Sequence, residues 1–223
     1  MKLFKMAAGV LAAGFIAGAQ AAPTFSEGFD DVAGLAGAGW VLTNLSSPAG
    51  LNWFQGNSGI FAAESGAPDA YVGANFNSTT TVSGVIDNWL ISPEMSIGAG
   101  STLTFYTQAS DAGFLDKLDV RFSSGASSDV ASFTTVIGTV GSGGSYPVGS
   151  WMAVTLSLPT AVSGRVAFHY TVPNAMDASY IGIDSVSVTA ATAVPESSTL
   201  AMLGLGLAAV AVARRRQAAN TSS

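Results

Sequence analysis

The chain has 223 residues, no cysteine, a single histidine and a formal net charge of −6. The absence of cysteine excludes disulfides and thiol chemistry, and one histidine is too few for a histidine-rich metal site. Residues 23–193 contain thirteen acidic side chains and only three basic ones. A surface of this kind has no basic patch for nucleic acid or anionic lipid, so nucleic acid is excluded as a partner.

The first 21 residues have the pattern of a secretory signal peptide. Lys2 and Lys5 precede an uncharged run over residues 6–18, and Ala19-Gln20-Ala21 supplies the small residues that a signal peptidase reads. The apolar run is short for a membrane anchor, which needs about 20 residues. We therefore expect residues 1–21 to direct export and to be removed.

Residues 22–190 are expected to form one domain built from β-strands. Apolar and polar residues alternate with a period of two in four segments: 101–109, 118–124, 151–158 and 165–172. Clusters of Gly, Ser, Asn and Asp separate these segments. Many short strands at such spacing predict an all-β fold, an antiparallel β-sandwich or jelly roll.

The last predicted strand, YIGIDSVSV (180–188), changes phase along its length. Ile181 and Ile183 fall on one face, whereas Val186 and Val188 have the opposite parity. If all four are buried on one side, an extra residue must be inserted near Asp184, as in a β-bulge. The alternative is a regular strand that is buried on both faces.

Eight short stretches carry a family resemblance, and they occur in this order: FSEGFD (25–30), GW (39–40), DAYVGANFNST (69–79), DNWLISPEM (87–95), LTFYT (103–107), KLDVRFS (117–123), GRVAFHY (164–170) and YIGIDSVSV (180–188). The chain resembles the choice-of-anchor J domain, a relative of the cleaved-adhesin and MAM-like jelly rolls. This resemblance implies a jelly roll on an exported bacterial protein, without a general enzymatic activity. His169 departs from the pattern, because the family usually has Arg there.

The resemblance also implies a calcium site, since several of the family's relatives bind calcium. It points to Glu27 in the first strand and Asp184 in the last, with Asp30 as a third ligand. Carboxylate oxygens are suitable calcium ligands. The alternative is that Asp184 caps a turn and Glu27 is solvated.

The end of the chain, VPESSTLAMLGLGLAAVAVARRR (194–216), is similar to the PEP-CTERM sorting signal. Val194, Pro195 and Glu196 match the signal's opening, and Ser197 replaces the usual second proline. The resemblance implies an exosortase-type sorting protease as a partner. We expect residues 191–196 to form a linker and the PEP-like motif.

The remaining tail predicts a short membrane-spanning helix over residues 197–213, followed by a basic cytoplasmic tail over residues 214–223. Seventeen helical residues extend about 25 Å, a short span that bilayer thinning accommodates. Arg214, Arg215 and Arg216 would stop transfer and stay on the cytoplasmic side. The domain would then be held in the periplasm until it is released to the cell surface or the medium.

Several of the residue types that enzymes commonly use for catalysis are absent or rare in this chain: it has no cysteine and one histidine. His169 shares the outward face of its predicted strand, which disfavours a catalytic base, and Asp111, Asp116 and Asp119 suggest a loop and a solvent-facing strand. Among the tryptophans, Trp53 lies in a loop-like context and is the candidate for contact with a ligand such as a sugar.

We therefore expect an exported, exosortase-sorted surface or extracellular-matrix protein with a non-catalytic binding or adhesion domain, for which exopolysaccharide is a candidate ligand. Two alternatives are a purely structural matrix protein and a secreted glycan hydrolase.

Overall fold

The computed structural model describes residues 23–191 together with Gly204 and Val210. The predicted signal peptide, the motif Val194–Glu196 and the arginines 214–216 lie outside the described residues, as does most of the predicted span 197–213. Among the described residues, no helix has the length and apolar character needed to cross a membrane.

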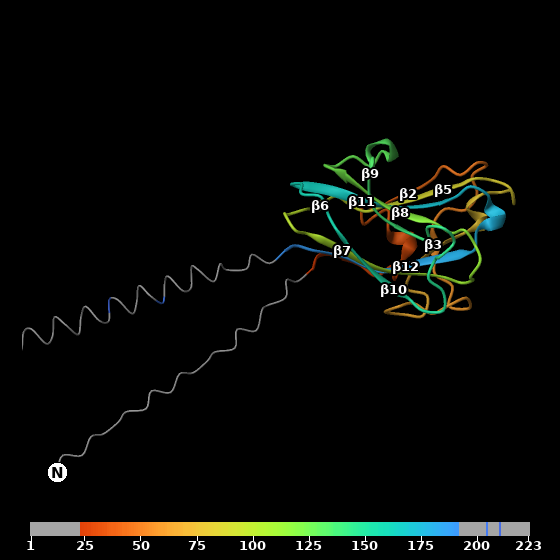
Figure 1. Ribbon diagram of the computed structural model, residues 1–223, viewed down its shortest axis with the longest axis horizontal. Helices are drawn as coiled ribbons and strands as arrows, with labels where there is room; N and C mark the ends of the chain where they lie inside the picture. The colour runs from red at the N-terminus through yellow and green to blue at the C-terminus, as the bar shows by residue number, and fades with distance from the viewer. Residues whose placement is uncertain (1–22, 192–203, 205–209, 211–223) are drawn as a thin grey trace, which may run out of the picture.

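Two six-stranded antiparallel sheets make up the domain (Figure 1). Sheet A contains β1 (Pro23–Glu27), β3 (Phe54–Gln55), β4 (Val72–Asn75), β7 (Thr102–Ala109), β10 (Met152–Ser157) and β12 (Tyr180–Thr189). Sheet B contains β2 (Val41–Asn44), β5 (Ile86–Ile91), β6 (Met95–Ser96), β8 (Leu118–Ser124), β9 (Thr135–Val140) and β11 (Ser163–Val172). Four single-turn 3-10 helices lie in the connections: η1 (Val32–Gly34), η2 (Phe76–Ser78), η3 (Val130–Ser132) and η4 (Ala175–Asp177).

The strand order is β10-β7-β12-β4-β3 in sheet A, with β1 beside β12, and β2-β5-β11-β8-β9 in sheet B, with β6 beside β11. Figure 1 shows the sheets as two layers. The predicted all-β sandwich is therefore confirmed.

The alternating segments supply the core between the sheets. In β7, Leu103 and Phe105 are fully buried, whereas Thr102 and Thr104 on the other face are half-buried. Phe105 packs edge-on against Phe168 of the opposite sheet, with ring centroids 5.1 Å apart. Burying each such side chain stabilises the fold by about 1.5–3 kcal/mol.

The predicted bulge in β12 is present. Asp184 pairs with Tyr106 and Ser187 pairs with Thr104, so two residues of β12 face one residue of β7. Ser185 has a φ of 50°, which accommodates the extra residue. The bulge restores the phase of the strand and brings four apolar residues into one core: Ile181, Ile183, Val186 and Val188.

The two ends of the sandwich have different roles. Pro23 of β1 pairs with Thr189 of β12, so the chain enters and leaves the domain at the same end. Tyr180 begins the ten-residue strand β12 at the other end, and a strand of this length spans roughly 30 Å. We call this other end the distal end; in Figure 1 it carries η4.

Candidate functional site: a pocket at the distal end

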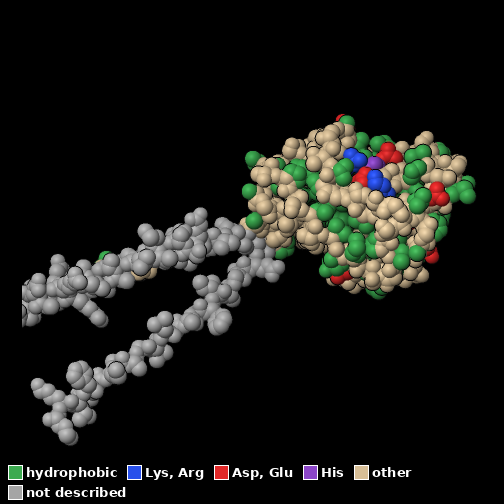
Figure 2. Space-filling model, in the orientation of Figure 1, with side chains coloured by type: hydrophobic (Ala, Val, Ile, Leu, Met, Phe, Trp, Pro, Cys, Tyr) green, Lys and Arg blue, Asp and Glu red, His purple; other side chains and the backbone are tan. Residues whose placement is uncertain are grey.

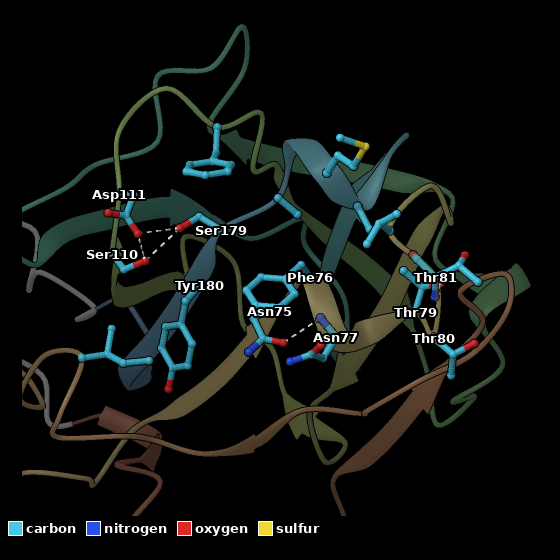
Figure 3. Close-up of a pocket in the computed structure, with 16 residues that line it drawn as sticks. Asn75, Phe76, Asn77, Thr79, Thr80, Thr81, Ser110, Asp111, Ser179 and Tyr180 are labelled. Carbon is cyan, nitrogen blue, oxygen red and sulfur yellow. Dashed lines mark hydrogen bonds between the residues drawn. The ribbon is translucent and has the colours of Figure 1, made fainter.

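Three connecting segments enclose a pocket at the distal end (Figure 3). Residues 75–82, 110–114 and 175–180 line most of it, and its volume is about 640 Å³. Ligand-binding pockets typically have volumes of about 300–1,000 Å³. We call this site the distal pocket.

The first wall follows β4 directly. The side chain of Asn75 accepts a hydrogen bond from the backbone N–H of Asn77 at 2.8 Å and so begins η2. This turn points Phe76 outward, and half of its surface is exposed. The backbone N–H of Phe76 donates to the carbonyl of Ser179 at 3.2 Å, which ties η2 to the start of β12.

The second wall carries a carboxylate among hydroxyl groups. Ser110 follows β7, and its backbone N–H donates to the carbonyl of Tyr180 at 2.9 Å. The hydroxyl of Ser110 donates to Oδ2 of Asp111 at 2.7 Å, and the hydroxyl of Ser179 donates to the same oxygen at 3.3 Å. Figure 3 shows these three side chains together at one end of the pocket, with Phe76 between them and the threonines 79–81.

The third wall is the connection between β11 and β12. Asn174 caps η4 by accepting a hydrogen bond from the backbone N–H of Met176 at 3.1 Å. The backbone N–H of Ala175 donates to the carbonyl of Gly84 at 2.9 Å, which joins η4 to the β4–β5 connection. Met176 and Val82 are 65 % and 73 % exposed, so two apolar side chains on fixed turns face solvent.

A second carboxylate lies behind the pocket wall. Asp116 is fully buried and accepts hydrogen bonds from the hydroxyl of Tyr170 at 2.6 Å and the backbone N–H of Ser179 at 2.9 Å. Burial raises the pKa of Asp116, the two hydrogen bonds oppose that rise, and the charge of Asp111 adds to it. The prediction of a solvent-exposed loop is therefore wrong for Asp116, because the loop folds its carboxylate inward to hold Ser179.

The basic side chains lie elsewhere. Among the described residues, no lysine or arginine lines the distal pocket. Lys117 and Arg121 contact Asp119 at 3.0 and 3.4 Å on the outer face of sheet B. Arg165 donates to the carbonyls of Ser92, Ala126 and Gly39, as three hydrogen bonds between 2.7 and 3.3 Å.

The outer face of sheet B holds a compact polar cluster, which we call the sheet B cluster: Asp87, Trp89, Asp119, Arg121 and His169. His169 stacks on Trp89 with ring centroids 3.9 Å apart, and its Nε2 lies 2.8 Å from Oδ1 of Asp87. Trp89 Nε1 donates to the same carboxylate oxygen. Figure 2 shows basic, acidic and histidine side chains side by side on one face.

His169 points outward, as predicted, but it is covered by its neighbours. The side chain is 11 % exposed. Burial lowers the pKa of His169, and Asp87 opposes that effect. Asp119 is likewise buried rather than solvent-facing, because Thr139, Lys117 and Arg121 all contact its carboxylate.

The predicted calcium ligands have separate local roles. Both oxygens of Asp184 accept backbone hydrogen bonds, from Glu64 at 2.8 Å, from Ser65 at 3.1 Å and from Ser185. Burial raises the pKa of Asp184. Asp184 therefore caps the bulge and the loop over it, which agrees with the alternative reading of this residue.

Glu27 accepts a hydrogen bond from the backbone N–H of Phe29 at 2.8 Å, and Asp30 is exposed. Phe29 has a φ of 55°, so Glu27 stabilises a strained turn. Within residues 23–191, no three His, Asp or Glu side chains form a group that could hold a metal ion. The arrangement described does not fit a calcium site, and calcium binding at Glu27, Asp30 and Asp184 stays a prediction.

Trp53 is buried and not exposed to a ligand. The side chain is only 4 % exposed, belongs to the main core and packs edge-on against Tyr170 with centroids 6.3 Å apart. The glycine- and asparagine-rich segment around it looks like a surface loop, but Trp53 directly precedes β3 and its indole packs into the core. The expectation of an exposed Trp53 is wrong.

Apart from Asp111, the sequence pattern does not point to the residues of the distal pocket. Phe76 sits between two asparagines, and Met176 follows Asn174 by two residues, so each lies in a turn with an asparagine cap. Asparagine is a turn-forming residue, so these two segments are recognisable as turns but not as parts of one pocket. The three segments meet only through tertiary pairing, which the sequence pattern does not reveal.

The fold and the pocket define a two-sheet β-sandwich with a binding-type site on its loops. At the C-terminus, residues 193–216 match the PEP-CTERM protein-sorting motif. The chain is therefore an exported protein that carries a surface-sorting signal, as the sequence predicted.

Similarity to known proteins supports the predicted cleaved-adhesin resemblance. The K3 cleaved adhesin domain of Lys-gingipain from Porphyromonas gingivalis superposes with a TM-score of 0.58 at 24 % identity, over 77 % of this chain and 99 % of that domain. The K1 domain gives a TM-score of 0.56 at 23 % identity, over 75 % and 98 %. These likenesses establish the shared jelly-roll-type fold.

Two whole proteins of P. gingivalis are also similar. Lys-gingipain is 29 % identical over 48 % of this chain and 7 % of its own length, and Hemagglutinin A is 29 % identical over 48 % and 5 %. The chain therefore spans a small part of each relative, and the similarity concerns a domain within them.

Proposed function

We propose that this protein is exported, sorted by an exosortase-type protease and displayed at the cell surface or in the extracellular matrix, where its β-sandwich binds a glycan through the distal pocket. Exopolysaccharide is the candidate ligand. The observation that carries the proposal is an open pocket with an exposed aromatic ring among amide and hydroxyl groups.

The chemistry of the lining suits a sugar. A pyranose ring has apolar C–H faces and a polar rim, so it fits beside an aromatic ring that is flanked by hydrogen-bonding side chains. Phe76 supplies the ring, Asn75 and Asn77 supply amides, and the threonines 79–81 supply hydroxyls. These polar groups lie on turns that are fixed by their own backbone hydrogen bonds.

The position of the pocket suits surface display. The chain enters and leaves the sandwich at one end, and the pocket opens at the other. A tether that follows residue 191 would therefore direct the pocket away from the attachment point. This arrangement leaves the site accessible to a polymer in either the anchored or the released form.

The terminal segments would direct export and sorting before the domain binds its ligand. We propose that signal peptidase removes residues 1–21, that residues 197–213 hold the protein in the inner membrane through the stop at Arg214–Arg216, and that the protease acts near Val194–Glu196. Mass spectrometry of the mature protein tests this sequence of events. A C-terminus that still includes Arg214 in surface-exposed protein would contradict it.

A glycan array probed with the purified protein tests the binding function. Phe76→Ala should abolish capture of the bound glycans, because it removes the most exposed of the aromatic rings that line the pocket. Val82→Ser should weaken capture, whereas Val162→Ser, which changes a 94 % exposed valine outside the pocket, should leave capture unchanged.

If the protein captures no glycan, the alternative of a purely structural matrix protein takes precedence. If capture persists in Phe76→Ala and Val82→Ser, the ligand binds elsewhere and the distal pocket is not the site.

A further inference from the structure

Resting on the proposed glycan-binding function, we propose that the distal pocket selects glycans that carry a free amino group, such as chains containing glucosamine, with Asp111 as the residue that binds the ammonium. Three features of the pocket support this assignment: the charge around it, the free oxygen of Asp111 and the small number of carboxylates that line it.

The surroundings of the pocket are acidic. Asp111 lines it and Asp116 lies directly behind it, joined through Ser179, which donates its hydroxyl to Asp111 and its backbone N–H to Asp116. Neither carboxylate forms an ion pair with a lysine or arginine in the described part of the chain. The field at this end is therefore negative, and an acidic or sulfated glycan would be repelled.

The side chain of Asp111 is held in place by two hydroxyl groups. Its Oδ2 accepts from the hydroxyls of Ser110 and Ser179, which hold the side chain in place. Within residues 23–191 no hydrogen bond reaches its Oδ1, and the residue is exposed. A fixed carboxylate with one free oxygen is ready to accept a charge-assisted hydrogen bond from an ammonium group.

The lining of the pocket suits an ammonium group better than a metal ion. Calcium takes six to eight oxygen ligands and commonly several carboxylates, whereas Asp111 is the only acidic residue that lines the pocket among the described residues. An ammonium group has three donors, and it can donate to Oδ1 of Asp111 and to the half-buried hydroxyl of Ser110. Ser179 is buried and its hydroxyl lies 2.8 Å from that of Ser110, so it supports this pair from behind. The sugar ring would then extend toward Phe76, which lies next to this group in Figure 3.

Isothermal titration calorimetry with two oligosaccharides of equal length tests the inference. One is a glucosamine tetramer, which is cationic in mildly acidic buffer, and the other is the neutral N-acetylglucosamine tetramer. We expect the purified protein to bind the cationic tetramer about tenfold more tightly, which corresponds to ~1.4 kcal/mol. Added salt should reduce the preference, because the contact is solvent-accessible.

Two variants of equal charge change locate the effect. Asp111→Asn should lose the preference while it keeps the affinity for the neutral tetramer. Asp69→Asn removes one exposed carboxylate outside the pocket and should keep the preference.

Each of the following outcomes would overturn the inference. Equal affinity for the two tetramers, or an unchanged preference in Asp111→Asn, removes the assigned role of Asp111 and leaves glycan binding intact. Equal loss of the preference in Asp69→Asn shows general attraction to an acidic protein. If neither tetramer binds although the array captures other glycans, the ligand class is wrong; if the array captures none, the proposed function fails with it.

Discussion

The sheet B cluster and the distal pocket both gather polar and aromatic side chains, but they differ in how these groups are paired. In the cluster, Asp87 accepts from both Trp89 and His169, and Asp119 is contacted by Lys117 and Arg121. In the pocket, Asp111 keeps a free oxygen and Phe76 is half exposed. The carboxylates of the cluster are therefore paired inside the protein, although Nδ1 of His169 and Nε of Arg121 are buried without a partner. The pocket instead keeps a carboxylate oxygen and an aromatic ring open to solvent.

The largest effect on stability should come from the cluster. Trp89→Ala removes a 7 % exposed ring that contacts His169, Phe133 and Arg121. The free energy of unfolding should fall by about 3–5 kcal/mol. Urea denaturation measures this loss, and a loss below 1 kcal/mol would show that the cluster is not a structural element.

A smaller loss should follow from Asp87→Ala. The change leaves Trp89 Nε1 and His169 Nε2 without their acceptor, at a cost of about 1–3 kcal/mol. It should also lower the pKa of His169 further below 6.5, because Asp87 is the main group that opposes the effect of burial.

The titration of His169 can be followed directly by NMR, because it is the only histidine in the chain. A folded pKa below the unfolded value means that stability is lost as the pH falls from 6.5 through the lowered pKa. Asp87→Ala should extend that loss to lower pH. If the pKa of His169 rises in Asp87→Ala, Asp87 is not the group that opposes the effect of burial.

Much of the scaffold follows from the sequence pattern, and most of the site does not. The phase change between Ile183 and Val186 predicts the bulge in β12, because only an inserted residue buries both on one side. Trp53 misleads because its neighbours have loop composition while its own side chain enters the core. Local pattern reports which face a residue occupies, but not which distant segment covers it.

The distal pocket shows this limit most clearly. Asp111 and Ser179 are 68 positions apart in the sequence, and they meet because β7 and β12 are neighbours in sheet A. Neither residue has a distinctive local motif. The prediction of their proximity needs the strand order, which alternation alone leaves open.

The carboxylate behind the pocket gives a weaker, pH-dependent effect. Burial raises the pKa of Asp116 above 3.8, so the folded state holds its proton to higher pH than the unfolded state does. Stability therefore decreases as the pH rises through that window, by at most about 1.4 kcal/mol per pH unit. Asp116→Asn keeps an acceptor for Tyr170 and should lack this decrease.

Thermal melts of both proteins across this pH range provide the measurement. The melting temperature of Asp116→Asn minus that of the parent should become more positive as the pH rises from below 3.8. A constant difference would show that Asp116 has the same pKa in the folded and unfolded states.

The smallest effect on stability should come from the pocket itself. Met176→Ala removes a 65 % exposed side chain and should change the free energy of unfolding by no more than about 0.5 kcal/mol. It should nevertheless weaken glycan binding. Met152→Ala, which changes a 40 % exposed methionine on β10, is the matched control and should leave binding unchanged.

The central claim is that the distal pocket is where the protein meets its ligand, and methionine methyl NMR tests it most directly. The described domain contains three methionines, Met95 in β6, Met152 in β10 and Met176 in η4. Titration of ¹³C-methyl-methionine protein with a bound oligosaccharide should shift the Met176 signal and leave the signals of Met95 and Met152 in place. A shift of Met152 alone, or an unmoved Met176 signal at saturation, would contradict the account.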